Sequence, residues 1–349
     1  MKPKLVIIGS GVSGCYLAYK YKNKYDITII DKNNKVGGKI QTYKGYSMST
    51  QFFSSFLLPD FLKQIFKKLN LKPYKLNGEF FKITQFKNRL LCFIIIIISL
   101  IVIFKIDIRL VILVIIILLI IFKKQIIKNT EYQLILGFGG CYNNFNHYMK
   151  NRQDNYLLII CSILINYFNI GFIKDEYIKI INYLVKDIKD MRLNSTCIDF
   201  SKLNKYIIIQ SNGNKYKLNY DKLVLCYDIR YCKYINIKNI ISKPPPQFYF
   251  YSIYIKLNKL IKFPKYIIGY TKASSNEYIL ASTKYPNKND FINNEMKVFT
   301  WKNSYNNLSK IDKCKLNNFF NKYDIYTIGE HIDGQGFLNK LNQANNLIL

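Results

Sequence analysis

Histidine and closely spaced cysteine are scarce in this chain of 349 residues. The 2 histidines, His147 and His331, lie far apart, and none of the 8 cysteines belongs to a CxxC pair or to a Cys/His ligand spacing. Because a zinc site needs several such ligands close together, no metal site is expected. Unpaired cysteines predict free thiols in a reducing compartment, and no signal peptide precedes the first expected strand, so we predict an intracellular protein.

Acidic residues are also few, with 21 Asp and Glu against 52 Lys and Arg, for a formal net charge of +31. Such an excess can indicate nucleic acid or a charged membrane as a partner. The lysines are scattered among many Ile, Asn and Tyr residues, however, which we interpret as a compositional bias toward A- and T-rich codons, and nucleic-acid binding is not expected. The sequence shows no Ser/His/Asp set and no paired carboxylate site, which disfavours hydrolysis.

The first forty residues contain the clearest pattern. Leu5–Ile8 is a short apolar run typical of a buried parallel strand, and Gly9, Gly11 and Gly14 follow it with GxGxxG spacing. A helix is expected from about residue 14 to residue 24, so that its amino end would face a diphosphate. In this motif the first glycine permits the turn, the second lets the pyrophosphate approach, and the third lets the helix pack closely.

A second strand is predicted over Tyr25–Ile30, and Asp31 follows it, 22 residues after Gly9. A carboxylate at this place accepts hydrogen bonds from ribose hydroxyls and repels a 2′-phosphate. The strand, glycine turn, helix, strand and acid together predict a dinucleotide-binding βαβ unit that does not use NADP.

Two further segments resemble the flavin-containing amine oxidase and phytoene desaturase superfamily. KNNKVGGKIQT resembles its N-terminal extension, an acid followed by a Gly-Gly-Arg/Lys turn and a nearby Thr. Near the other end, YDIYTIGEHIDGQGFLNKLNQANNLI is similar to its second flavin motif, a strand leading into Gly-Glu and then a glycine before the last helix. The residues implied to hold the cofactor, FAD, are Gly9, Ser10, Gly11, Val12, Ser13, Gly14, Asp31, Lys32, Gly37, Gly38, Lys39, Thr42, Gly329, Glu330, Gly336 and Phe337.

The resemblance implies an FAD-dependent oxidoreductase of the amine oxidase type, acting on a small-molecule substrate, either an amine or an apolar compound. A desaturase or protoporphyrinogen-oxidase-like enzyme is the alternative within the same fold. A degenerate, non-catalytic flavoprotein is the third reading, because Ser49 and Gln51 stand where the family usually has Asp and Gly near the flavin ring. No residue is singled out as catalytic.

Residues 90–122 form two apolar runs separated by Lys105, Asp107 and Arg109. Each run would span only about 20 Å as a helix, against a hydrocarbon thickness of about 30 Å. Two interpretations stay open: a hairpin that enters a membrane, flanked by basic residues, or a segment buried in the protein.

The expected fold is α/β, an FAD-binding Rossmann-like parallel sheet of the glutathione-reductase type with a smaller mixed substrate domain and an apolar helical insertion. We assign residues 1–56, 137–235 and 320–349 to the FAD-binding domain, 57–89 and 236–319 to the substrate domain, and 90–124 to the apolar hairpin. Local patterns predict helices over 57–71 and 157–172, a hairpin turning at Asn212-Gly213, a strand over 222–227 that rejoins the main sheet, and four further strands between residues 248 and 303.

Overall fold

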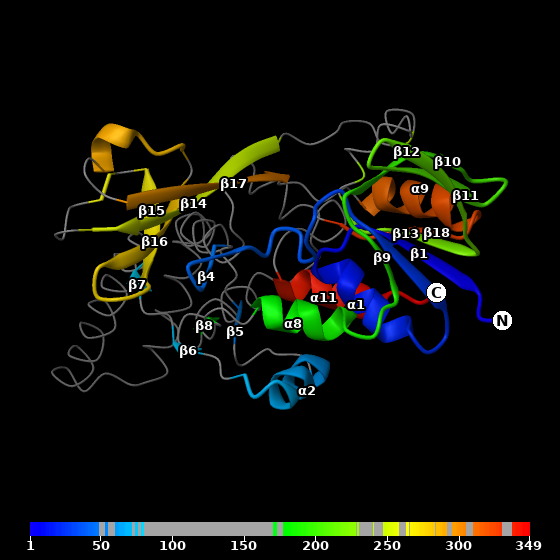
Figure 1. Cartoon of the computed structure of the whole chain (residues 1–349), viewed down its shortest axis with the longest axis horizontal. Coiled ribbons are helices and arrows are strands. Elements are labelled where there is room, and N and C mark those ends of the chain that lie inside the picture. Colours follow the sequence, from blue (N-terminus) through cyan, green and yellow to red (C-terminus); the bar gives the residue numbers. More distant parts are fainter. Residues whose placement is uncertain are drawn as a thin grey trace, which may run out of the picture.

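A parallel sheet forms the centre of the larger part of the molecule in the computed structural model (Figure 1). The structure describes residues 1–48, 53–54, 60–71, 74–75, 78–79, 170–172, 177–227, 229, 240, 247–257, 263–264, 266–282, 284–291, 295–304, 310–329 and 337–349. The five strands of the sheet lie in the order β18-β13-β1-β2-β9, and all neighbours are parallel. Their bounds are β1 Lys4–Ile8, β2 Asp26–Ile30, β9 Asp190–Arg192, β13 Lys222–Leu225 and β18 Ile325–Thr327.

Both faces of this sheet are covered, which explains why β1 is apolar at four consecutive positions. Leu5 and Ile7 pack in one core cluster, whereas Val6 and Ile8 pack in another on the opposite face. Since side chains alternate across a strand, a strand buried on both faces must be continuously apolar. The predicted α/β class with a parallel Rossmann-like sheet is therefore confirmed.

Helices cover one face, and an antiparallel sheet together with a helix covers the other (Figure 1). The helical layer consists of α1 Val12–Tyr21, α2 Asp60–Lys68, α8 Tyr177–Val185 and α11 Phe337–Asn346. The opposite layer consists of β10 Ser195–Ser201, β11 Tyr206–Ser211, β12 Asn214–Asn219 and α9 Lys310–Asn321. The helices expected near residues 14–24 and 57–71 are confirmed, although α1 begins two residues earlier and ends three residues earlier than expected, and α2 is shorter at both ends.

The predicted hairpin turn lies between β11 and β12. Asn212 and Gly213 have φ angles of 49° and 83°, the two positive values that a two-residue hairpin turn of this kind requires. The chain then enters β13, which pairs with β1 and confirms the predicted returning strand. The crossover from β9 to β13 is thus made by the three-stranded sheet β10-β11-β12.

A second, antiparallel sheet forms the smaller part of the molecule, in the order β17-β14-β16-β15-β7. The four strands predicted from the sequence are all present: β14 Gln247–Lys256, β15 Ile267–Lys272, β16 Glu277–Ser282 and β17 Glu295–Ser304. They are joined by β7 Gly78–Glu79, which pairs with β15. Residues 78–79, far away in the sequence, therefore contribute an edge strand to this sheet.

One predicted helix is wrong at its carboxyl end. Ile170–Phe172 forms strand β8, which pairs with β5 Phe53–Ser54 and β6 Tyr74–Lys75. A short apolar run cannot be assigned to helix or strand by its pattern alone, and here pairing with two distant segments decides it. Residues 90–122, 157–169, Ser49 and Gln51 lie outside the described residues. Among the helices that the structure does describe, none has the length and apolar character needed to span a membrane.

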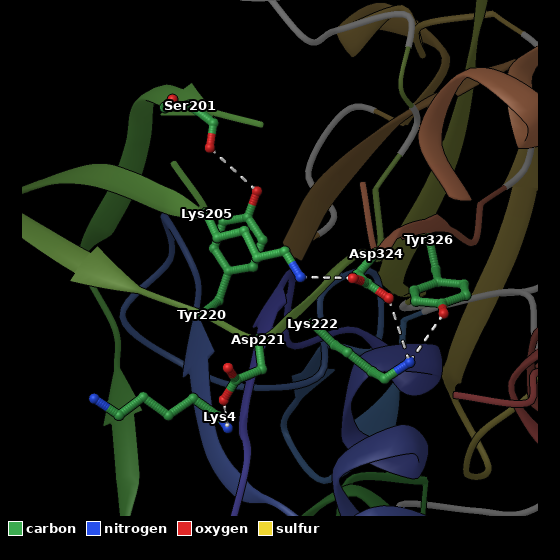
Figure 2. Close-up of polar contacts among 8 residues, drawn as sticks. All are labelled: Lys4, Ser201, Lys205, Tyr220, Asp221, Lys222, Asp324 and Tyr326. Carbon is green, nitrogen blue, oxygen red and sulfur yellow. Dashed lines mark hydrogen bonds and ion pairs between the residues drawn. The ribbon is translucent and has the colours of Figure 1, made fainter. Parts of the chain in front are cut away.

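Charged side chains close the amino edge of the parallel sheet (Figure 2). The Asp324 carboxylate accepts a hydrogen bond from Lys205 Nζ at 2.6 Å and lies 3.6 Å from Lys222 Nζ. The backbone amide of Lys4 donates to the Asp221 carboxylate at 2.6 Å. These contacts fasten the first residues of β1, β13 and the turn before β18 to one another. A ligand is therefore expected at the carboxyl edge, where open α/β sheets usually bind their ligands.

A hairpin connects the two parts of the molecule. β3 Thr42–Tyr43 and β4 Tyr46–Ser47 follow the second glycine turn, and the Tyr46 hydroxyl donates to Glu277 Oε2 of the second sheet at 3.2 Å. Glu277 also accepts hydrogen bonds from the hydroxyls of Tyr254 and Ser274. The hydrogen bond from Tyr254 lowers the pKa of Glu277 the most. The hydrogen bond from Ser274 and the positive charge of Lys256 lower this pKa further. Burial in turn raises the pKa of Tyr254 to about 12.

The hydrogen bonds that Glu277 accepts predict that part of the protein's stability is lost in acid. Because the folded protein lowers the pKa of Glu277, the carboxylate stabilises the fold above its unfolded pKa and loses that effect as the pH falls through the folded pKa. We expect Glu277→Gln to lower the thermal midpoint at neutral pH and to approach the wild type below about pH 4. Glu295→Gln is the matched control. Glu295 pairs with the exposed Lys44, and exposed ion pairs contribute little to stability, so this variant should unfold at nearly the same temperature as the wild type. A difference for Glu277→Gln that persists unchanged in acid would contradict the assignment.

Candidate dinucleotide-binding site

The turn after β1 requires glycine at two positions for reasons of space. Gly9 has a φ of 107°, and a Cβ there would lie 2.9 Å from the carbonyl oxygen of Cys226. A Cβ on Gly14 would lie only 1.9 Å from the Gly9 carbonyl oxygen. The backbone of α1 is therefore pressed against the turn, in agreement with the role predicted for the third glycine of the motif.

Gly11 differs from these two glycines because a Cβ there would meet no atom within 4 Å. Its φ of −66° is open to any residue, so neither the backbone nor the neighbouring protein atoms demand glycine. Gly11 is also the N-cap of α1, makes no side-chain cap, and is followed by no acidic residue in the first turn. The first amides of the helix and the open space beside Gly11 are what a diphosphate needs.

The second glycine turn lies against the first. The amide of Gly37 donates to the Ser10 carbonyl at 2.8 Å, and Gly37 forms a parallel bridge with Gly11. A Cβ on Gly38 would lie 3.1 Å from the Gly11 Cα. The structure thus brings together the glycines of both turns, which the sequence places in two separate motifs.

Asp31 lies at the end of β2, buried, with 7% of its surface exposed. Its Oδ2 accepts hydrogen bonds from the amide and the hydroxyl of Ser10, both at 2.7 Å, and its Oδ1 accepts one from the Asn33 amide at 2.8 Å. The carboxylate therefore ties the glycine turn to β2 and places negative charge beside it. Of the other predicted site residues in this region, Lys32 and Thr42 are exposed at its rim, and Lys39 is half-buried.

The C-terminal segment reaches the same edge. The amide of Ile328, just after β18, donates to the Leu225 carbonyl at 2.9 Å, and Gly329 follows it, buried. Helix α11 begins at Phe337, as predicted. Glu330 and Gly336 lie outside the described residues, so their predicted roles remain predictions.

Helix α11 runs parallel to α1 and beside it (Figure 1). Ser13 of α1 contacts the carbonyl of Lys340 at 3.4 Å, and one turn later Tyr16 donates to Asn345 Oδ1 at 2.9 Å. The Tyr21 hydroxyl then donates to the Leu347 carbonyl at 2.7 Å. Because both helices run in the same direction, their amino ends lie at the same edge of the sheet.

Several groups near the site were not predicted from the sequence. The thiols of Cys15 and Cys226 lie beneath the glycine turn, where Cys15 Sγ donates to the Ser10 carbonyl at 3.0 Å. Burial raises the pKa of the Cys15 thiol, with the neighbouring Cys226 and Asp31 adding to the effect, and burial likewise raises the pKa of Cys226. Both thiols are therefore protonated packing groups and not nucleophiles.

These residues fit a dinucleotide. The open space at Gly11 and the helix amides suit a diphosphate, and the carboxylate of Asp31 suits ribose hydroxyls.

The packing around Gly14 and Gly11 predicts that the same substitution, glycine to alanine, changes stability by very different amounts at the two positions. Gly14→Ala should lower the free energy of unfolding by about 2 kcal/mol or more, because its Cβ would overlap the Gly9 carbonyl. Gly11→Ala should change the free energy of unfolding by less than about 0.5 kcal/mol, because its Cβ enters open space. Urea unfolding of both variants measures this. Equal destabilisation of the two would show that the turn is packed differently.

The chain was compared with known proteins. Residues 7–52 match the model of the NAD(P)-binding Rossmann-like domain. No curated protein matches the sequence. Three solved structures are similar over 98–99% of this chain: a candidate protoporphyrinogen oxidase from Exiguobacterium sp. 255-15 (TM-score 0.56, 10% identity, 97% of that chain), a CLA-producing fatty acid isomerase from P. acnes (0.61, 13%, 99%) and an oxidoreductase from Methanosarcina mazei (0.53, 10%, 100%). Residues 7–52 thus match an NAD(P)-binding Rossmann-like domain, and the chain shares its overall fold with these three proteins.

Proposed function

We propose that the protein is an FAD-dependent oxidoreductase of the amine oxidase type. The observation that supports this most strongly is the meeting of the two terminal segments at one edge of the sheet, with the amino ends of α1 and α11 side by side. FAD would supply a hydride acceptor for a substrate C–H and would pass the electrons to oxygen, and the residues around Gly11, Asp31 and Gly329 would hold it. The protein holds the cofactor and orients it against the substrate.

The strand order suggests how an elongated cofactor would be held. The residues after β2, β1, β13 and β18 follow one another along the edge, so that Asp31 and Gly329 are three strand spacings apart, about 14 Å. Asp31 would bind the adenosine ribose, and the turn at Gly11 would bind the diphosphate. Gly329 and the start of α11 would then lie at the flavin half, where the amides at the start of α11 would favour negative charge.

The surroundings of Asp31 favour FAD or NAD over NADP. Three donors already bind the carboxylate, which has about four acceptor positions and therefore keeps capacity for a ribose hydroxyl. A 2′-phosphate beside this buried anion would be repelled. Together with the second motif at Gly329, which resembles a flavin motif, this supports FAD as the cofactor.

An FAD-dependent desaturase or protoporphyrinogen-oxidase-like enzyme with an apolar substrate is the second candidate. It is supported by the fold shared with the candidate protoporphyrinogen oxidase and with the fatty acid isomerase. The second sheet is rich in aromatic residues. Those in the described part, such as Tyr254 and Trp301, are buried against Met48 and form core packing, so they do not favour one substrate over the other.

The visible absorption spectrum of the purified protein tests these candidates. A flavin band that bleaches on addition of an amine supports the amine oxidase proposal, and bleaching by a porphyrinogen or a fatty acid supports the second candidate. A flavin band that no such compound bleaches indicates the non-catalytic flavoprotein. Protein that takes up no flavin contradicts all three.

Substitution of Gly11 separates binding from folding. Gly11→Val should abolish FAD retention, because its branched side chain would fill the open space where the diphosphate approaches. The fold should survive, since the backbone of Gly11 is in a region that valine adopts. Flavin absorbance and circular dichroism of the purified variant measure the two effects, with Gly213→Ala, in the distant β11–β12 turn, as a control that should keep its flavin. Full flavin occupancy in Gly11→Val would contradict the assignment of the site.

A further inference from the structure

Lys340 lies near the start of α11, on the side of that helix that meets α1. It is the fourth residue of α11, and its backbone carbonyl is contacted by Ser13 Oγ at 3.4 Å. Ser13 is in turn the second residue of α1, directly after the glycine turn. Lys340 is therefore close to the amino end of α1, where a diphosphate would bind.

The charged end of Lys340 is inside the protein. The residue as a whole is half-buried, whereas its Nζ atom is buried. A lysine at a surface usually has the reverse arrangement, in which the aliphatic stem covers apolar groups and the ammonium reaches water. A charge held within the protein acts on its neighbours through a lower dielectric than a charge in water, so this ammonium can influence a charged ligand nearby.

Cys226 indicates where this charge acts. It follows β13 at the carboxyl edge and packs on the face of the sheet that the helices cover, the face to which α1 and α11 also belong. The positive charge of Lys340 opposes the effect of burial on the pKa of Cys226. The carbonyl oxygen of Cys226 lies 2.9 Å from where a Cβ on Gly9 would be. Since helical side chains lean toward the amino end of their helix, Lys340 extends toward this edge and the glycine turn.

Opposite charges lie on the two sides of the glycine turn. On the side of β2, the carboxylate of Asp31 adds to the effect of burial in raising the pKa of Cys15. On the side of β13, Lys340 acts on Cys226 in the opposite direction. Neither α1 nor α11 has an acidic residue in its first turn. A diphosphate at Gly11 would thus be repelled by Asp31 and attracted by Lys340.

We propose that Lys340 is a positioning residue whose positive charge attracts the diphosphate of the cofactor to the glycine turn. This rests on the proposed function, in which the diphosphate binds at Gly11. The amides of α1 would make the hydrogen bonds, and the ammonium beneath the turn would offset the negative charge of Asp31. The inference extends to any ligand that carries a diphosphate, ADP included.

The test removes the charge and keeps the length of the side chain, in Lys340→Met and in Lys340→Gln. Apo-protein is titrated with FAD, ADP and riboflavin, and its thermal midpoint is measured without ligand. We expect both variants to bind FAD and ADP about tenfold more weakly than the wild type, because both ligands carry a diphosphate. Riboflavin has no phosphate and should bind to the variants as it does to the wild type.

Two comparisons separate the charge of Lys340 from other effects. Lys315→Met makes the same substitution at an exposed position of α9, on the opposite face of the sheet, and should change none of the affinities. It also controls for the loss of one positive charge from the whole protein. Lys340→Gln keeps a hydrogen-bonding group, so equal losses in Lys340→Gln and Lys340→Met would show that the charge matters. If Lys340→Met does not fold, Lys340→Gln alone tests the proposal.

Three results would overturn the proposal. FAD and ADP affinities equal to those of the wild type would show that the charge does not reach the diphosphate. Wild-type affinities in Lys340→Gln alone would show that a hydrogen bond and not the charge is needed. An equal loss for riboflavin would show a general distortion of the site. The proposed function fails separately: in that case the wild type takes up no FAD, whereas the loss of ADP affinity in the Lys340 variants still tests the role of this residue.

Discussion

The docking of α11 on α1 is the contact on which the candidate site depends. The hydroxyls of Tyr16 and Tyr21 and the ammonium of Lys20 bind the last residues of the chain, while Leu341 and Ala344 enter the core next to the sheet. These contacts join residues more than 300 positions apart and align two helices with their amino ends at one edge. Without them, the glycine turn and the tail strand would be unrelated features of an α/β protein.

The glycines of the first turn differ in the space around them. Gly14 has no room for even a methyl group, because its Cα rests against the turn at Gly9, whereas Gly11 faces open space. The same motif therefore contains two glycines that the fold requires, Gly9 and Gly14, and one, Gly11, that the proposed ligand would explain. Asp31, held by Ser10, fixes the position of this turn on the sheet. Neighbouring residues of one short segment thus have different roles, some in folding and one in the proposed binding of a ligand.

Much of this could be predicted because the relevant information is local. The strand, glycine spacing and acid at Asp31 specify a βαβ unit within thirty residues, and Asn212-Gly213 specifies its hairpin through backbone preference alone. Ile170–Phe172 was predicted as helix and is a strand, because its pairing with two short distant segments is invisible in its own pattern. The position of Cys226 beneath the glycine turn was missed for the same reason, since it becomes apparent only when β13 pairs with β1.

Hydrogen exchange with and without FAD tests most directly whether the two terminal segments bind one cofactor together. FAD should slow the exchange of amides in residues 9–15 and in residues 326–343 to a similar degree, and should leave the hairpin at Asn212-Gly213 unchanged. Protection of the first segment alone, or of neither, would contradict the joint site.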